Sequence, residues 1–170
     1  VVGIMHVLMF WGFLMLSSDM FDLATANWFS GELLPSALVG PWNGIVELGY
    51  TIALIGCVAA LTRRVVFTPE KLKGKSQLEG NFILFLIMTI TTTSFIVESG
   101  ESPSSTWEPL GYWFAEQGVT EGQVIAAYWA HMLAICTFFV LIPMSKHMHL
   151  VMAFPTVFFY DTEPMAKMQP

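Results

Sequence analysis

The chain has 170 residues, of which 55% are hydrophobic and only 12% are charged. Soluble domains usually carry about 25% charged residues, so this composition excludes an ordinary soluble domain. The net charge is −6 with only 7 Lys and Arg residues, which excludes a basic surface for nucleic acid. Cys57 and Cys136 form no CxxC or CxxCH motif. We therefore expect no zinc site, iron–sulfur cluster or covalently attached haem in this segment.

Four apolar runs follow one another along the chain and predict four membrane-spanning helices. Their approximate limits are residues 1–17, 45–67, 81–97 and 124–144, and the last can continue past Pro143 to Phe154. A span needs roughly 20 apolar residues, or somewhat fewer if its start has been cut off. We predict an all-α transmembrane helical bundle over residues 1–154. Residues 155–170 are then a cytoplasmic extension that leads to a partner domain.

The loops between these spans differ in charge. The loop between the second and third spans is basic and Lys146 follows the fourth span, whereas the other two loops are acidic. Cytoplasmic loops of membrane proteins are enriched in Lys and Arg, so we predict a multi-pass protein of the cell (inner) membrane with a cytoplasmic C-terminus. The predicted cytoplasmic loop at residues 63–75 carries Arg63, Arg64, Lys71, Lys73 and Lys75.

All four histidines, His6, His131, His147 and His149, lie in or beside the predicted spans. Ionisable residues within a membrane usually face the bundle interior and serve a function, and neutral imidazole is a good ligand for haem iron. On one regular helix, His131 and His149 would share a face with about 27 Å of rise between them. His6 begins the first span from the cytoplasmic side, at the predicted depth of His149. Imidazoles from two facing helices at one depth can hold a haem between them, although membrane histidines also serve proton transfer.

Helix geometry separates two further groups of residues. His147 lies about 200° around the helix from His149, so the two cannot face the same iron. We place His147 and Lys146 at the cytoplasmic interface, as candidates for the propionate end of a haem. Glu47 lies at about the depth of His131, and a carboxylate and an imidazole there can accept protons from a quinol. Glu47 can equally be an interfacial residue or bridge two helices.

Sequence motifs over nearly the whole chain resemble known membrane redox proteins. The stretch LIGCVAALTRRVVFTP and the last span, which ends in IPMSKHMH, are similar to the respiratory nitrate reductase gamma subunit, a membrane cytochrome b. Four stretches are closer to the N-terminal membrane domain of iron–sulfur oxidoreductases related to heterodisulfide reductase: HVLMFWGFLML, SFIVESGE, WEPLGYWFAE and SKHMHLVMAFPTVFF. Those proteins are thought to link electron-transfer flavoprotein to menaquinone.

The resemblance implies one haem b held by His6 and His149, a further span upstream and a downstream cytoplasmic domain with iron–sulfur clusters. The resemblance to the gamma subunit does not directly imply a second haem in this chain. The gamma subunit has a second histidine at the position of Leu16, and leucine cannot bind iron. A ligand opposite His131 would have to be another residue, such as Met20, or come from upstream. His131 and Glu47 therefore remain candidates for a second haem site or a quinone site.

We therefore expect a membrane haem b electron-transfer module, the cytochrome b part of a quinone-linked oxidoreductase. It would pass electrons between quinone or menaquinone in the lipid and a cytoplasmic iron–sulfur partner, with electron-transfer flavoprotein as a further partner. Two alternatives remain: a proton-translocating or ion-translocating protein that uses His131 and Glu47, and a haem-free membrane anchor. Haem content distinguishes the first reading from both alternatives.

Overall fold

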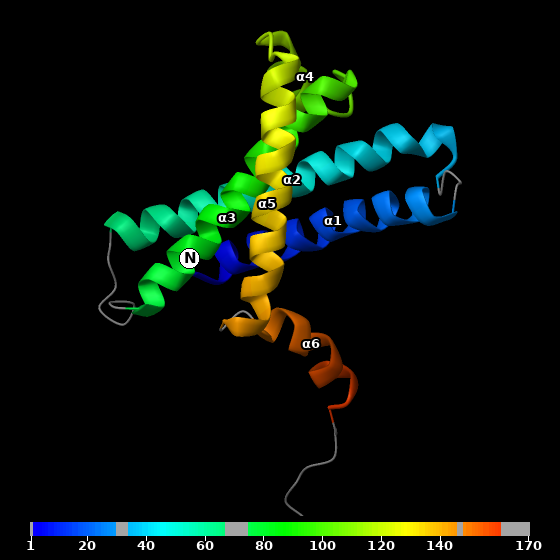
Figure 1. The fold of residues 1–170 in the computed structure, drawn as a ribbon. Coiled ribbons are helices and arrows are strands. Elements are labelled where there is room, and N and C mark those ends of the chain that lie inside the picture. The colour runs from blue at the N-terminus through cyan, green and yellow to red at the C-terminus, as the bar shows by residue number, and fades with distance from the viewer. Residues whose placement is uncertain (1, 30–33, 67–74, 146–147, 161–170) are drawn as a thin grey trace, which may run out of the picture. The chain divides into compact units, whose positions relative to one another are not determined.

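The computed structural model describes residues 2–29, 34–66, 75–145 and 148–160, and its regular elements in these ranges are helices. They are α1 (Val2–Phe29), α2 (Ser36–Val66), α3 (Lys75–Glu98), the 3₁₀ helix η2 (Ser99–Glu101), α4 (Pro109–Glu116), α5 (Glu121–Met144) and α6 (His149–Phe158) (Figure 1). The predicted all-α class is confirmed. The chain divides into two units, residues 1–135 and 136–170.

Three helices in the described residues are long and apolar enough to cross a membrane. They cover Ala37–Val66, Gln77–Glu101 and Glu121–Met144. These helices agree with the second, third and fourth predicted spans. In α1, the apolar stretch recognised among the described residues is Gly3–Ser18, which is shorter than these three. The first span therefore stays a prediction.

α2 begins at Ser36, whereas the sequence predicted a start near residue 45. Pro41, which precedes the predicted start, lies inside the helix. Proline has no backbone N–H and removes one intrahelical hydrogen bond. Membrane helices tolerate this loss because neighbouring groups satisfy the freed backbone carbonyl. The extra turns contribute Pro41 and Gly44 to the lining of the pocket described below.

α1 and α2 lie side by side (Figure 1), and glycines allow their backbones to approach closely. A Cβ atom added to Gly12 would lie 2.8 Å from the Cβ of Ala53, and one added to Gly49 would lie 2.5 Å from the Cβ of Met15. The order of these contacts makes the pair antiparallel. Membrane helices pack through such small residues because lipid provides no hydrophobic force that drives them together.

An aromatic cluster joins α2, α3 and α4 within residues 1–135. Buried Tyr50 packs edge to face on buried Phe95 with 5.8 Å between ring centroids, and Phe95 stacks on Phe114 at 6.2 Å. Val46 completes the buried group, and Leu16, Trp42 and Leu54 pack around it. This cluster fixes the first half of α2 against the end of α3, where the candidate site residues lie.

The helix that contains His131 ends before His149. α5 ends at Met144 and a separate helix, α6, begins at His149. Pro143 lies immediately before the break, and proline both lacks an N–H donor and crowds the preceding turn. The fourth span therefore does not continue past Pro143 to Phe154. A regular helix from His131 to His149, the condition for the two residues to share one face, is therefore not present.

Candidate functional site

Glu47 is a buried carboxylate in the first half of α2, with 3% of its surface exposed. Its Oε1 accepts a hydrogen bond from the backbone N–H of Leu110 at 2.7 Å, and its Oε2 accepts one from Gly111 at 3.3 Å. Both donors lie in the first turn of α4, where backbone N–H groups have no partner within the helix. The positive end of the helix dipole also favours a carboxylate there. Glu47 thus caps α4 from another helix.

The N-cap residue of α4 does not itself cap the helix. Glu108 occupies the N-cap position, but its side chain makes no capping hydrogen bond. Its Oε1 instead accepts from the side-chain amide of Asn43 at 3.0 Å, and its Oε2 accepts from the backbone N–H of Ser104 at 2.9 Å. The carboxylate of Glu47 on α2 thus holds the start of α4, and the carboxylate of Glu108 in turn binds Asn43 on α2. The bonds of Glu47 join two helices, as one of the alternatives for this residue predicted, although its partners in α4 were not predicted.

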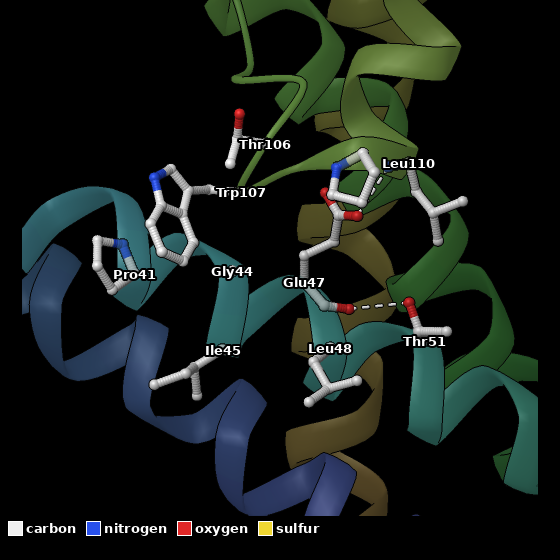
Figure 2. Close-up of a pocket in the computed structure, with 10 residues that line it drawn as sticks. Pro41, Gly44, Ile45, Glu47, Leu48, Thr51, Thr106, Trp107 and Leu110 are labelled. Atoms are coloured by element: carbon white, nitrogen blue, oxygen red, sulfur yellow. Dashed lines mark hydrogen bonds between the residues drawn. The ribbon is translucent and has the colours of Figure 1, made fainter.

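A pocket of about 550 Å³ lies between α2 and the segment that precedes α4 (Figure 2). Trp107 forms one wall and stands close to Pro41 and Gly44. A Cβ atom on Gly40 would lie 2.7 Å from Cδ1 of Trp107, so the indole packs directly on the helix backbone. The lining is mostly apolar and comprises Pro41, Gly44, Ile45, Glu47, Leu48, Thr51, Thr106, Trp107, Pro109 and Leu110.

His131 on α5 forms hydrogen bonds with α3. Its Nδ1 lies 3.1 Å from the carbonyl oxygen of Ile90, 3.0 Å from Oγ1 of Thr93 and 3.4 Å from Oγ of Ser94. A carbonyl oxygen can only accept a hydrogen bond. The hydroxyls of Thr93 and Ser94 donate to the carbonyls of Thr89 and Ile90, at 2.7 and 2.9 Å. The network therefore assigns the proton of the neutral ring to Nδ1.

This tautomer leaves the lone pair of the neutral His131 ring on Nε2. That nitrogen is the one able to bind a metal or to accept a proton. Metal-binding histidines are commonly oriented in this way, by a hydrogen bond from the other ring nitrogen to a carbonyl oxygen. The hydroxyl residues of α3 were not singled out from the sequence, although the run TTTS at residues 91–94 interrupts an apolar helix and is a visible signal.

The structure assigns Glu47 and His131 to two different hydrogen-bond networks, one at the start of α4 and one on α3. The networks adjoin the same aromatic cluster. Tyr50, about one turn after Glu47, contacts Phe95, and the neighbouring Ser94 lies beside His131. The pocket lining includes Glu47, and it does not include His131 among the described residues. A role for both residues in a single site stays a prediction.

The two predicted haem ligands lie in different units. His6 is exposed on α1, roughly 120° around the helix from the contact at Gly12. His149 is the exposed first residue of α6. His6 belongs to residues 1–135 and His149 to residues 136–170, and their pairing stays a prediction. Lys146 and His147, the candidates for the propionate end, lie outside the described residues.

No group of three or more His, Cys, Asp or Glu side chains in the described ranges could hold a metal ion. A haem held by one histidine from each of two helices needs only two such ligands. The exposed imidazoles of His6 and His149 have suitable donor chemistry for this kind of ligation. Haem b in this chain stays a prediction.

Comparison with known proteins gives distant relatives that are redox enzymes. The chain is 30% identical to the probable iron-sulfur-binding oxidoreductase FadF of Bacillus subtilis over an alignment of 177 residues, which covers 98% of this chain and 25% of that protein. The chain has distant homologues among iron–sulfur oxidoreductases. It is also 26% identical to the EtfAB:quinone oxidoreductase of Syntrophomonas wolfei over 184 residues, which cover 96% of this chain and 26% of that protein.

The chain spans about a quarter of the length of the curated relatives it matches. No protein-family model matches the chain. No solved structure matches it either. The names of the relatives agree with the predicted relation to iron–sulfur and quinone-linked oxidoreductases, while the resemblance to the nitrate reductase gamma subunit stays a prediction.

Proposed function

We propose that this chain is the membrane part of a quinone-linked oxidoreductase, which passes electrons between membrane quinone and an iron–sulfur partner. The similarity to two redox proteins over 96–98% of the chain carries this proposal. One relative is named as an iron–sulfur-binding oxidoreductase and the other as an EtfAB:quinone oxidoreductase. Three helices able to span a membrane fit a module that meets its quinone within the lipid. The iron–sulfur clusters would lie in a partner domain or subunit, and electron-transfer flavoprotein is the proposed further partner.

The proposed cofactor of this module is one haem b with His6 and His149 as axial ligands. Both imidazoles are exposed, so neither is enclosed by the packed core of its own unit. The haem would supply one-electron redox chemistry when bound, and the chain would supply two nitrogen ligands in an apolar environment that tunes the reduction potential. Leu16, partly buried on α1, cannot serve as a ligand to a second haem.

His131 is the candidate for a second haem ligand or for proton exchange with quinone. Its fixed Nδ1–H tautomer supports either role, because both need a lone pair at Nε2. A relay between His131 and Glu47, as in the proton-translocating alternative, gains no support from their separate hydrogen-bond networks. The alternative of a haem-free anchor gives no functional reason for an imidazole at His131 that is oriented by hydrogen bonds to α3.

The proposed location is the cell (inner) membrane, with the loop at residues 63–75 and the C-terminus in the cytoplasm. The positive-inside rule supports this orientation, since Arg63 and Arg64 lie in the last turn of α2. His149, Lys146 and His147 would then lie at the cytoplasmic side. Electrons would be exchanged with the iron–sulfur partner at that side.

A visible spectrum of the purified full chain tests the proposal. We expect a b-type α band after reduction with dithionite. His6→Ala and His149→Ala should each abolish the band, because each removes one axial nitrogen. His147→Ala should keep it, because His147 is not one of the two proposed axial ligands. A wild-type chain without the band, or one whose band survives both ligand substitutions, would contradict the haem assignment.

A further inference from the structure

We infer that the pocket between α2 and the segment that precedes α4 is the docking site for the ring of a membrane quinone or quinol. This inference rests on the proposed function and gives it a location. It places the quinone ring next to Glu47 in the first half of α2, in the pocket described above. His131, on α5, is not among the described residues that line this pocket.

The position of the pocket suits a ligand that arrives through lipid. The residues from α2 that line it lie within the membrane-spanning stretch Ala37–Val66. Two of them, Ile45 and Leu48, have 46% and 51% of their surface exposed, so the pocket lies at the apolar surface of the helix. A quinone carries its ring on a long apolar tail. The tail can stay in the bilayer while the ring enters the pocket beside Trp107.

The chemistry of the lining selects a neutral aromatic ring that bears oxygen atoms. No Lys, Arg or His belongs to the described lining, and Glu47 would repel an anionic lipid headgroup. The flat indole of Trp107 offers a surface on which a planar ring can stack. A volume of about 550 Å³ lies within the range of about 300–1,000 Å³ typical of ligand pockets. These features together favour a quinone ring over a phosphate-bearing headgroup.

Two oxygen groups at the side of the pocket can hold a quinol hydroxyl. A carboxylate has about four acceptor positions, and α4 occupies two of those on Glu47. The hydroxyl of Thr51 donates to the backbone carbonyl of Glu47 at 2.9 Å, as Figure 2 shows, so its oxygen is left as an acceptor. Because α4 already holds the carboxylate in place, Glu47 would bind a ligand without first ordering its own side chain.

Equilibrium binding of a labelled menaquinone with a single isoprenoid unit tests the inference. The full chain is placed in lipid nanodiscs, and empty discs correct for partition of the label into lipid. The wild-type chain should show saturable binding. Leu48→Trp should fill the pocket and weaken binding about tenfold or more, which corresponds to at least about 1.4 kcal/mol. Trp107→Leu should also weaken binding, because it removes the stacking surface.

Ile55→Trp is the matched control for Leu48→Trp. Ile55 lies two turns along the same face of α2 and is 56% exposed, but it does not line the pocket. This variant should bind the quinone as the wild type does. Wild-type affinity in both Leu48→Trp and Trp107→Leu would overturn the inference. So would a wild-type chain without saturable binding, which is the expected result if the pocket holds only a lipid acyl chain.

Haem content measured on the same samples separates this inference from the proposed function. Saturable, Leu48-dependent binding in a chain that carries no haem would retain the quinone site and refute the haem assignment. A chain that carries haem but whose quinone binding is absent or insensitive to these substitutions would retain the electron-transfer proposal and refute this location for the quinone.

Discussion

Replacing Glu47 with alanine would remove the carboxylate that holds the first turn of α4. In the wild-type chain this carboxylate accepts two backbone N–H groups, from Leu110 at 2.7 Å and Gly111 at 3.3 Å. The side chain of Glu108, at the N-cap, is committed to Asn43 and Ser104 and makes no capping bond. In Glu47→Ala the first turn of α4 would therefore lose its side-chain cap.

The size of the effect follows from the two hydrogen bonds. A hydrogen bond to a charged group contributes about 1.5–3 kcal/mol, and loss of a helix cap costs about 0.5–2 kcal/mol. Because one of the two bonds is long, we expect local opening of the 104–116 segment to become easier by about 2–4 kcal/mol. At 1.4 kcal/mol for each factor of ten, this is an increase in opening of roughly 30-fold to 700-fold.

Hydrogen exchange of the full chain in nanodiscs, read by mass spectrometry, measures this opening directly. Peptides that cover residues 104–117 should exchange faster in Glu47→Ala, whereas peptides from α3 should be unchanged. Glu47→Gln keeps one carbonyl acceptor and should lie between wild type and Glu47→Ala. Glu121→Ala, which removes an exposed glutamate at the start of α5, is the control. Equal exchange at residues 104–117 in Glu47→Ala and Glu121→Ala would refute the capping role.

Two further substitutions test the helix contacts. Gly12→Ala should destabilise the α1–α2 pair by about 1–3 kcal/mol, since its new methyl group would meet Ala53 at 2.8 Å. Gly3→Ala, which meets nothing within 4 Å, should leave thermal stability in detergent unchanged, and equal melting of the two variants would disprove the contact. Thr93→Val should lower the free energy of unfolding by about 1 kcal/mol, because it removes a hydroxyl that accepts a hydrogen bond from His131. The exposed Thr92→Val is its control, and a Thr93→Val chain as stable as that control would rule out the hydrogen bond.

The sequence predicted the helices well because their signal is local. Runs of apolar residues identify the second, third and fourth spans, and the structure has a helix for each. The start of α2 was predicted less well, because the helix begins at Ser36 and includes Pro41, upstream of the predicted start near residue 45. The predicted end of the fourth span at residue 144 agrees with the end of α5 at Met144, whereas the optional continuation past Pro143 is absent. Whether a proline ends a helix depends on neighbours that satisfy the freed carbonyl.

The candidate site could be predicted only in part, since its key contacts join residues far apart in the chain. Glu47 and His131 were singled out because ionisable residues in apolar helices are costly and usually functional. Their actual partners were not predictable from local pattern: Leu110 lies 63 residues from Glu47, and Ile90 lies 41 residues from His131. Trp107 forms a wall of the pocket, a contact that the local sequence pattern did not predict.

The haem-to-protein ratio of the purified full chain tests the central claim most directly. It is measured by extracting the haem as its pyridine complex and dividing by the protein concentration from amino-acid analysis. We predict one haem b per chain in the wild type and a ratio near zero in both His6→Ala and His149→Ala. A wild-type ratio near zero, or an unchanged ratio in either variant, would contradict the assignment of these two histidines to one iron.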